Sequence, residues 1–508
     1  MNIVIVPKEQ KIPSSSTNTA YLHVDYWNDY SFVTMFFLSV FDEDGTSHDI
    51  GQVKIGFKGQ TTEKSTYRTL KSPLKSLPQE YFSVGQDVEY YKKMHLLPEQ
   101  VRIALLEGLR DIVHTPNLID SVQDEDVFRT SLLRWVSLSV IKGQFSAVLE
   151  GRNELTNFEF KFSRPATDKM SAIDLTFKVN VGDKPSTNIH AIIGRNGVGK
   201  TTILNGMIEA ITNATDSTGK FYDLENREDS PIEPDYFSSL VSVSFSAFDP
   251  FNPPDEQPDP SKGTCYFYIG LKQNGTDKLK EVVDVHEDFI QALKACLSQE
   301  SKRARWLRAI DTLESDENFE SMNLKALPRY SGVRLARNAR KWIKKMSSGH
   351  AVVLLTITRL VATVEEKTLV LIDEPESHLH PPLLSAFLRA LSDLLLDRNG
   401  LSIIATHSPV VLQEVPRNCV WKINRSGLVT EPRRPDMETF GENVGVLTRE
   451  VFGLEVVKSG FHDLLVRTVD AGGTYDEIVE DYRGQLGIEA RALLKALVVN
   501  RDRSMGEC

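Results

Sequence analysis

The stretch Gly194–Thr201, GRNGVGKT, decides the fold of this chain, because it matches the pattern G-x-x-x-x-G-K-[ST] in full. It follows the apolar run AII and precedes TTILNGMIEA, so a predicted strand, a glycine-rich loop and a predicted helix come in that order. In such a loop the glycines let backbone N–H groups turn toward a phosphate at the positive end of the helix dipole. The alternative, a glycine-rich turn that matches by chance, is disfavoured by this order. The stretch predicts a phosphate-binding loop, called the phosphate loop below.

The phosphate loop predicts that the chain binds ATP together with Mg²⁺. Lys200 is expected to contact the β- and γ-phosphates, and the Thr201 hydroxyl is expected to ligate Mg²⁺. The residues expected to contact the nucleotide are Gly194, Arg195, Asn196, Gly197, Val198, Gly199, Lys200, Thr201 and Thr202.

A second motif, TLVLIDEPE at Thr368–Glu376, places an acidic pair at the carboxyl end of a predicted buried strand. Ligands of open α/β sheets bind at that end. Asp373 is therefore expected to hold Mg²⁺ through water, and Glu374 is expected to polarise the attacking water. An acidic pair after an apolar strand is common by itself, but it gains weight about 170 residues after a phosphate loop.

A third motif, SIIATHSP at Ser402–Pro409, delivers Thr406 and His407 to the same sheet edge. A single histidine is usually a core or capping residue. At this edge, however, a neutral imidazole can hydrogen-bond the γ-phosphate and report its presence. His407 is therefore a second candidate catalytic residue beside Glu374.

The segment Met346–His350, MSSGH, opens an apolar run and is called the signature segment below. Read alone, it predicts a helix start with Ser347 or Ser348 as N-cap. A basic stretch precedes it, for which we prefer the interpretation of a solvated helix face over that of a stripe facing DNA or phosphate. The basic residues are Arg334, Arg337, Arg340, Lys341, Lys344 and Lys345.

Composition narrows the class of protein. A chain of 508 residues with 41% hydrophobic and 25% charged residues is typical of a globular protein with two or three lobes. We expect no membrane span, because no apolar run reaches about 18 residues, and no signal peptide, because the N-terminal residues MNIVIVPKEQ lack its pattern. The four cysteines lie far apart without a CxxC pair, which argues against a disulfide framework or cysteine metal cluster and suits a cytoplasmic protein. The net charge of −11 argues against a protein that coats DNA broadly.

Four motifs together, GRNGVGKT, MSSGH, LIDEPESHLHP and ATHSP, resemble the ABC-type ATPase fold in their order and spacing. The resemblance covers about Phe158–Leu412. It is closest to the OLD- and AAA_21-like branch, of which SHLHP at Ser377–Pro381 is typical. The resemblance implies an α/β fold in which a mixed β lobe joins a parallel α/β core. It also implies that Ser347, Ser348 and Gly349 contact the γ-phosphate of ATP on another subunit, so that the chain is at least a dimer.

On this basis the chain divides into five predicted segments. These are an N-terminal α+β extension of unknown role (1–150), an ATPase lobe with the phosphate loop (151–282), a charged helical lobe (283–345), the rest of the ATPase core (346–430) and a C-terminal helical region for partner docking (431–508). Within the first segment we expect a hairpin of Phe32–Phe41 and Gly51–Phe57, and a helix from about Asp126 to Ile141.

Two positions depart from the family pattern. Members often carry a glutamine after the strand that corresponds to Leu240–Phe248, and here Ser246 or Asp249 would have to replace it, or the contact is absent. The signature segment ends in His350 instead of the usual glutamine. We therefore expect slow hydrolysis, which suits a regulatory clamp better than a motor.

Three functional classes follow from the resemblance. An OLD-type nuclease needs an Asp-x-Asp pair in a Toprim domain, and the roughly 100 residues after His407 contain none. A transporter ATPase normally carries an LSGGQ-like signature and lacks SHLHP. The remaining class is an ATPase with a separate effector, most like the ATPase subunit of Septu-type and retron-associated anti-phage systems. Its implied partners are an HNH-type nuclease and nucleic acid, either DNA or retron RNA–DNA. The alternative is a DNA-repair ATPase of SMC-like type with a short hinge.

Overall fold

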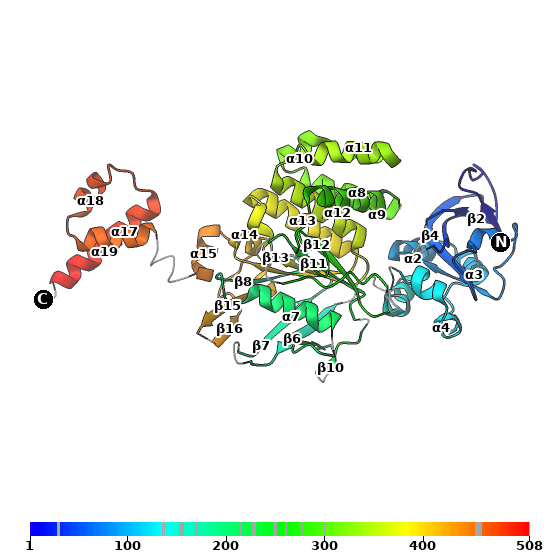
Figure 1. Ribbon diagram of the computed structural model, residues 1–508, viewed down its shortest axis with the longest axis horizontal. Helices are drawn as coiled ribbons and strands as arrows, with labels where there is room; N and C mark the ends of the chain where they lie inside the picture. The colour runs from blue at the N-terminus through cyan, green and yellow to red at the C-terminus, as the bar shows by residue number, and fades with distance from the viewer. Residues whose placement is uncertain are drawn as a thin grey trace.

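A seven-stranded sheet in the order β12-β11-β13-β14-β8-β15-β16 forms the centre of the molecule (Figure 1). The computed structural model describes residues 1–508 except 28–30, 135, 137, 152–156, 168–170, 214, 226–229, 235, 247–250, 260–261, 277, 299, 428, 453–459 and 507–508. Neighbouring strands are parallel throughout, apart from the antiparallel pair β15–β16. The strands are β8 Ile189–Gly194, β11 Ser239–Ser244, β12 Cys265–Gly270, β13 Thr368–Asp373, β14 Leu401–Thr406, β15 Val420–Ser426 and β16 Val429–Arg433.

Both faces of the sheet are buried at β12, β11, β13, β14 and β8, which explains why these strands are mostly apolar, whereas β16 is exposed or half-buried. In β8, Ala191 and Ile193 join the hydrophobic cluster on one face, whereas Ile192 joins the cluster on the other. In β13, Val370 and Leu371 divide in the same way. Successive side chains of these strands therefore point to opposite faces of the sheet and belong to two separate hydrophobic cores.

Helices cover one face of the sheet and a second sheet covers the other. On the first face α12 (Ser348–Thr363) and α13 (Pro381–Asp397) contact the strands, while α8 (Val282–Ser298) and α9 (Glu300–Leu313) pack on these two helices. On the other face α7 (Lys200–Thr212) lies beneath an antiparallel sheet in the order β10-β9-β6-β7. Its strands are β6 Phe158–Arg164, β7 Ile173–Val179, β9 Lys220–Asp223 and β10 Ser230–Pro231. The smaller helices are α10 Glu317–Met322, α11 Gly332–Ile343, α14 Pro409–Gln413 and α15 Val444–Phe452.

The N-terminal lobe has a hydrophobic core of its own and a five-stranded sheet in the order β1-β2-β3-β4-β5. The expected hairpin is confirmed, because β3 and β4 pair antiparallel. The strands are β1 Asn2–Val6, β2 Thr19–Val24, β3 Met35–Phe41, β4 Ser47–Phe57 and β5 Tyr81–Gly85. The helices are α1 Thr66–Thr69, α2 Val88–Leu96, α3 Glu99–Gly108, α4 Asn117–Val122, α5 Leu138–Val140 and α6 Ser146–Leu149.

The single helix expected from Asp126 to Ile141 was wrong. The chain instead forms π-helical turns at Phe128–Leu132 and Ile141–Phe145 around the short α5. At Ser131 the backbone carbonyl accepts a hydrogen bond from the buried Lys54 Nζ at 2.6 Å. This contact satisfies a buried cation with a carbonyl that a regular helix would use internally, so the tertiary environment overrides the helical pattern.

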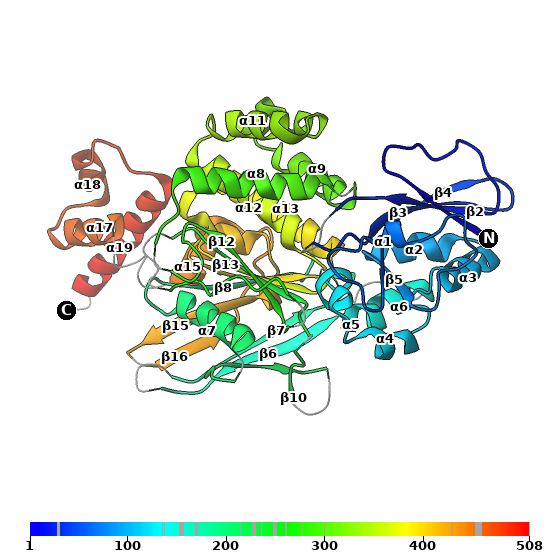
Figure 2. The same ribbon diagram turned by 45° about the vertical axis from the view of Figure 1, so that its right-hand side comes forward.

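The C-terminal region forms a separate small unit of α17 (Phe461–Asp470), α18 (Tyr475–Asp481) and α19 (Ile488–Gly506). Leu465, Ile478 and Leu494 lie at the centre of its own hydrophobic cluster. In both views this unit and the N-terminal lobe lie at opposite ends of the molecule (Figures 1 and 2). Among the described helices, none has the length and apolarity needed to cross a membrane.

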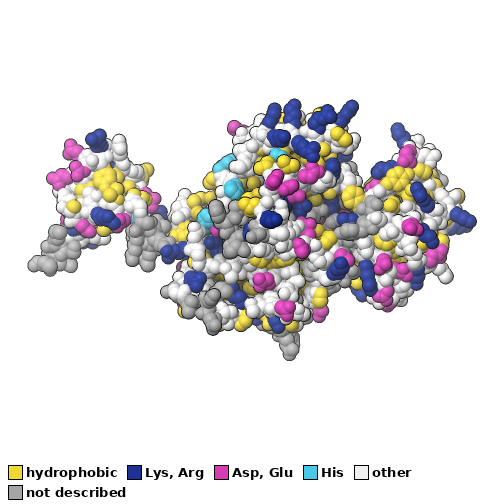
Figure 3. Space-filling view, in the orientation of Figure 1, with side chains coloured by type: hydrophobic (Ala, Val, Ile, Leu, Met, Phe, Trp, Pro, Cys, Tyr) yellow, Lys and Arg dark blue, Asp and Glu magenta, His cyan; other side chains and the backbone are white. Residues whose placement is uncertain are grey.

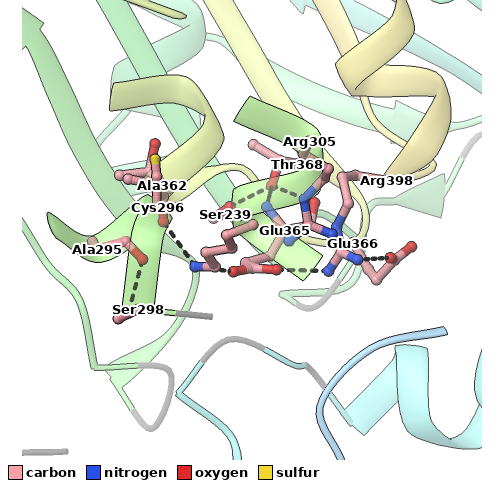
Figure 4. Close-up of polar contacts among 12 residues, drawn as sticks. Ser239, Ala295, Cys296, Ser298, Arg305, Ala362, Glu365, Glu366, Thr368 and Arg398 are labelled. Atoms are coloured by element: carbon pink, nitrogen blue, oxygen red, sulfur yellow. Dashed lines mark hydrogen bonds and ion pairs between the residues drawn. The ribbon is translucent and has the colours of Figure 1, made fainter. Parts of the chain in front are cut away.

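A buried ionic network joins the helical layers at the amino ends of the strands (Figure 4). Glu365, just before β13, contacts Lys302 of α9 and Arg398 at the end of α13, each at 2.6 Å. Arg398 also contacts Glu366 at 2.9 Å, and all four side chains are at most 6% exposed. Burial raises the pKa of Glu366 to about 7, although Arg398 opposes this rise. The network therefore carries a carboxyl group that is protonated in the folded protein below neutral pH.

The raised pKa predicts how stability depends on pH. Because the folded state holds the Glu366 proton up to about pH 7 and the unfolded chain releases it near 4.5, stability should fall as pH rises through this window. The loss amounts to roughly 3 kcal/mol, from about 1.4 kcal/mol per pKa unit. Urea unfolding of the wild type and of Glu366→Gln at pH 5 and pH 8 measures it. The variant should lack this component, and parallel pH profiles would contradict the prediction.

Candidate functional site

The carboxyl edge of the sheet gathers the predicted site residues. β13, β14 and β8 are adjacent and parallel, with Asp373 opposite Ala405 and Thr406 opposite Ile193. Three chain segments therefore end side by side: the phosphate loop after β8, the acidic pair at the end of β13, and the histidine after β14. The sequence separates these segments widely, and the strand order brings them together.

Glycines are required in the phosphate loop for two different reasons. Gly197 and Gly199 have φ angles of +78° and +98°, in the left-handed region that residues with side chains rarely adopt. At Gly194, an added Cβ would lie 2.5 Å from the carbonyl oxygen of Ile423 on β15. The first glycine thus permits close approach of a neighbouring strand, and the later two permit the turn into α7.

The ammonium group of Lys200 lies inside the curve of the phosphate loop. Its Nζ donates hydrogen bonds to the carbonyl oxygens of Gly194 at 3.0 Å and Arg195 at 3.1 Å, and the side chain is buried. Burial lowers the pKa of Lys200, and this effect is opposed first by Glu374 and then by Asp373. The ammonium group is therefore held by backbone oxygens and nearby acids where the loop would enclose a phosphate.

The two predicted Mg²⁺ ligands are in direct contact. Thr201 Oγ1, in the first turn of α7, donates to Asp373 Oδ2 at 2.8 Å across the end of β14. A hydroxyl and a carboxylate are the hard oxygen donors that Mg²⁺ prefers, and Mg²⁺ is usually held by few protein ligands together with phosphate oxygens and water. These residues fit the ion, with Thr201 and Asp373 on the protein side.

Glu374 and His407 lie next to each other, as expected for residues acting on one phosphate. The His407 Nδ1 atom is 3.6 Å from Glu374 Oε1. Glu374 has a φ angle of +47°, and such a left-handed conformation costs a residue with a side chain roughly 1–3 kcal/mol. This conformation occurs directly after the last residue of β13, Asp373.

Glu376 is a site residue that the sequence reasoning missed. Its Oε1 atom accepts hydrogen bonds from Thr406 Oγ1 and the His407 backbone N–H, both at 2.7 Å, and lies 3.1 Å from His407 Nδ1. The side chain is only 8% exposed. Glu376 therefore positions His407, and the only sequence signal for it was a third acid in DEPE.

The signature segment forms the start of α12, as the sequence predicted. Ser347 is the N-cap, its Oγ accepting from the His350 N–H at 3.4 Å, and both Ser347 and Ser348 are exposed. Gly349 is buried, and a Cβ there would lie 2.4 Å from the His378 carbonyl oxygen. This glycine is thus required by contact with the SHLHP segment of the same chain, whereas the two serines are exposed residues and the Ser347 hydroxyl also contacts His350 Nδ1 at 2.6 Å.

Two further expectations concern the replacement for the family's glutamine and the basic stretch before the signature segment. Ser246 lies just beyond β11, but Asp249 lies outside the described residues, so the replacement for the glutamine stays a prediction. The basic stretch is largely α11, which buries Leu335, Ala339 and Ile343 and presents its basic side chains to solvent (Figure 3). Arg340 pairs with Glu287 at 2.6 Å, and the interpretation of this stretch as a solvated face instead of a stripe facing DNA or phosphate stays a prediction.

Comparisons with known proteins give one matching family, a relative with high sequence identity and several distantly similar structures. Residues 273–413 match the family described as "AAA domain, putative AbiEii toxin, Type IV TA system". Protein ea59 of Escherichia phage lambda is 52% identical over 515 residues, covering 98% of each chain. Among solved structures, an ATP-binding cassette of an ABC transporter is 14% identical with a TM-score of 0.33, covering 59% of this chain and 98% of that one. A part of an ABC transporter complex from Clostridium perfringens is 15% identical with a TM-score of 0.29, covering 62% of this chain and 96% of that one.

The strand order and the placement of the motifs define the architecture. The chain has an ABC-ATPase-like nucleotide-binding fold, in which a parallel α/β core carries the phosphate loop and an antiparallel sheet covers α7.

Proposed function

We propose that this chain, which belongs to the same family as protein ea59 of Escherichia phage lambda, is a Mg²⁺-dependent ATPase that controls a separate nuclease. The contact between Thr201 and Asp373, beside Lys200 and Glu374, is the observation that carries the ATPase assignment. It joins a phosphate-binding loop, two oxygen ligands for Mg²⁺ and a candidate base at one sheet edge.

The proposed reaction is the attack of water on the γ-phosphate of ATP. Lys200 and the loop N–H groups would bind the phosphates, and Thr201 and Asp373 would hold Mg²⁺, which neutralises charge on the β- and γ-phosphate oxygens. Glu374 would orient and polarise the water, and His407, held by Glu376, would contact the γ-phosphate.

We also propose that two copies of the chain pair through shared nucleotide sites. Ser347 and Ser348 are exposed at the start of α12, where backbone N–H groups and the helix dipole favour an anion. The γ-phosphate of ATP held on another copy is the anion that we propose for this helix start. Each site would then combine the phosphate loop of one chain with the signature segment of the other.

Complementation between two inactive variants tests this pairing. Ser347→Arg should block the approach of the partner's γ-phosphate, and Lys200→Ala should disable the phosphate loop of its own chain. A mixed dimer retains one intact site, because each chain supplies the half that the other lacks. Mixing should therefore restore ATPase activity to at most about half of the wild-type value in a two-site dimer, measured as phosphate release.

A matched mixture is the control for this experiment. Lys200→Ala and Glu374→Gln change the same half of the site, so their mixture should show no recovery. If Ser347 serves only as a helix cap, Ser347→Arg costs roughly 1 kcal/mol of stability and mixing restores nothing. Absence of recovery between subunits that demonstrably exchange would refute the shared site.

We place the chain among ATPases that restrain or license a separate HNH-type nuclease in anti-phage defence, as in Septu and retron-associated systems. One observation favours this setting: the AAA_21 family that matches residues 273–413 is described by a toxin of a toxin–antitoxin system. The C-terminal unit of α17–α19 is the proposed docking element, and DNA or retron RNA–DNA is the proposed nucleic acid. An adjacent HNH gene would support this role, and an adjacent exonuclease gene would favour a DNA-repair ATPase.

A further inference from the structure

Three polar side chains from three separate helix starts converge beside the signature segment. Asp316 caps α10, His350 lies in the first turn of α12, and His380 caps α13. His350 Nε2 is 3.1 Å from Asp316 Oδ1, and His380 Nε2 is 3.4 Å from Asp316 Oδ2. One ligand atom from each residue lies within 4.8 Å of the other two.

The two contacts between Asp316 and the histidines, to its Oδ1 and Oδ2 atoms, are close to the ligand spacing of a first-row transition-metal site, and the three ligand atoms together lie within 4.8 Å of one another. Tetrahedral coordination with bonds of about 2.0–2.1 Å places ligand atoms about 3.3 Å apart. We propose that Asp316, His350 and His380 bind one Zn²⁺-class divalent ion, with a fourth position open to water. Two imidazole nitrogens and a carboxylate suit such an ion, whereas Mg²⁺ prefers oxygen ligands. The proposed site is thus chemically distinct from the Mg²⁺ site at Thr201 and Asp373.

The surroundings of Asp316 and His350 have the features of a supported metal site. Asp316 Oδ1 accepts hydrogen bonds from the Asn318 and Phe319 N–H groups, so backbone donors fix the orientation of the carboxylate. Asp316 and His350 are each only 9% exposed. The second ring nitrogen of His350, Nδ1, lies 2.6 Å from Ser347 Oγ. A metal-bound histidine usually donates this N–H to an oxygen acceptor, and Ser347 provides one.

His380 supplies the open side of the site. Its side chain is 48% exposed, which gives an ion a route from solvent. The Nδ1 atom accepts a long hydrogen bond of 3.4 Å from the Leu383 N–H. Coordination through Nε2 places the ring proton on Nδ1, so this weak cap must open and the Leu383 N–H must turn to water. The exposure of His380 makes that exchange inexpensive.

Metal binding would change what the Ser347 hydroxyl can donate to. When neutral His350 donates its Nε2–H to Asp316, the Nδ1 atom is an acceptor and the Ser347 O–H is directed toward it. With a metal on Nε2, the Nδ1–H donates to Ser347 Oγ, and the hydroxyl proton is released to face outward. This consequence for binding a partner's phosphate rests on the proposed function, whereas the metal site itself does not.

The test is a titration of the tag-free, full-length chain with Zn²⁺, in excess Mg²⁺ and without nucleotide. We expect one Zn²⁺ per chain at this site. Asp316→Asn and His380→Gln should each weaken binding by at least about tenfold, since loss of even an outer-shell partner typically costs 10–100-fold. Asparagine remains a good N-cap, so Asp316→Asn should preserve the start of α10.

His378→Gln is the matched control, because His378 is also exposed and lies two residues away in the same SHLHP segment. It should leave Zn²⁺ binding unchanged. Equal binding by the wild type and His380→Gln, or an equal loss in His378→Gln, would overturn the proposed site. The titration contains no ATP, so a chain that binds Zn²⁺ but hydrolyses no ATP would refute the proposed function alone.

Discussion

Glu374→Gln is expected to lower ATP turnover by about 10² or more while leaving ATP binding intact. The amide keeps the shape of the side chain but removes the charge that polarises the attacking water. Glu374 does not contact Thr201 in the way that Asp373 does, so the Mg²⁺ ligands should stay in place. As in related ATPases, the variant should accumulate the ATP-bound, paired form. Phosphate release measures turnover, and the molar mass of the protein in solution with ATP measures whether two copies are paired.

Glu209→Gln serves as the control for the loss of a negative charge, because Glu209 is exposed on α7, the helix that follows the phosphate loop. It should hydrolyse ATP at the wild-type rate. If Glu374→Gln also retains the wild-type rate, Glu374 is not the base, and the strained backbone at this position needs another explanation.

Lys200→Ala is expected to weaken ATP binding by about tenfold to more than a hundredfold. The change removes a charge-assisted contact with the phosphates, worth roughly 1.5–3 kcal/mol. It also removes the donor that binds the Gly194 and Arg195 carbonyl oxygens, so the phosphate loop itself loses an internal support. Equilibrium titration with a fluorescent ATP analogue measures the affinity.

The control for this variant is Lys220→Ala, which removes an exposed lysine from β9 and leaves the phosphate loop unchanged. Its affinity for ATP should equal that of the wild type. Unchanged affinity in Lys200→Ala would remove the basis for assigning the nucleotide to this loop.

The placement of the candidate site was largely predictable from sequence. Each motif follows a run of apolar residues, and parallel strands in one sheet present their carboxyl ends at one edge. Asp373 and His407 could thus be assigned to the same edge as Lys200 without knowing the strand order. The contact of Gly349 with the His378 carbonyl was not predictable, because it depends on how α12 packs against the SHLHP segment.

Elements that depend on tertiary pairing were missed. The strand β12 carries CYFYIG, a short apolar run that periodicity alone does not distinguish from part of a helix, and it follows a proline-rich loop. The β15–β16 pair alternates buried and exposed residues only weakly and lies at the sheet margin. Glu376 was missed for a related reason: its role is defined by Thr406 and His407, which are 30 and 31 residues away.

The structure shows which residues are contacted by His350, which stands where the family usually has a glutamine. In sequence it was a histidine where the family usually has a glutamine, and it predicted only slow hydrolysis. In the structure its two ring nitrogens connect Ser347 to Asp316, so the residue links the signature segment to the helical lobe. A glutamine carries no pair of ring nitrogens in this arrangement.

The separate core of the C-terminal unit has a consequence for the local concentration of whatever it binds. Residues 453–459 join α15 to this unit, and seven residues span at most about 25 Å even when fully extended. A molecule held by α17–α19 therefore cannot leave the neighbourhood of the ATPase core while it stays bound. Tethering of this kind gives an effective concentration on the order of millimolar. A contact between that molecule and the ATPase core would then form much of the time, even if it is too weak to form when both are free in dilute solution.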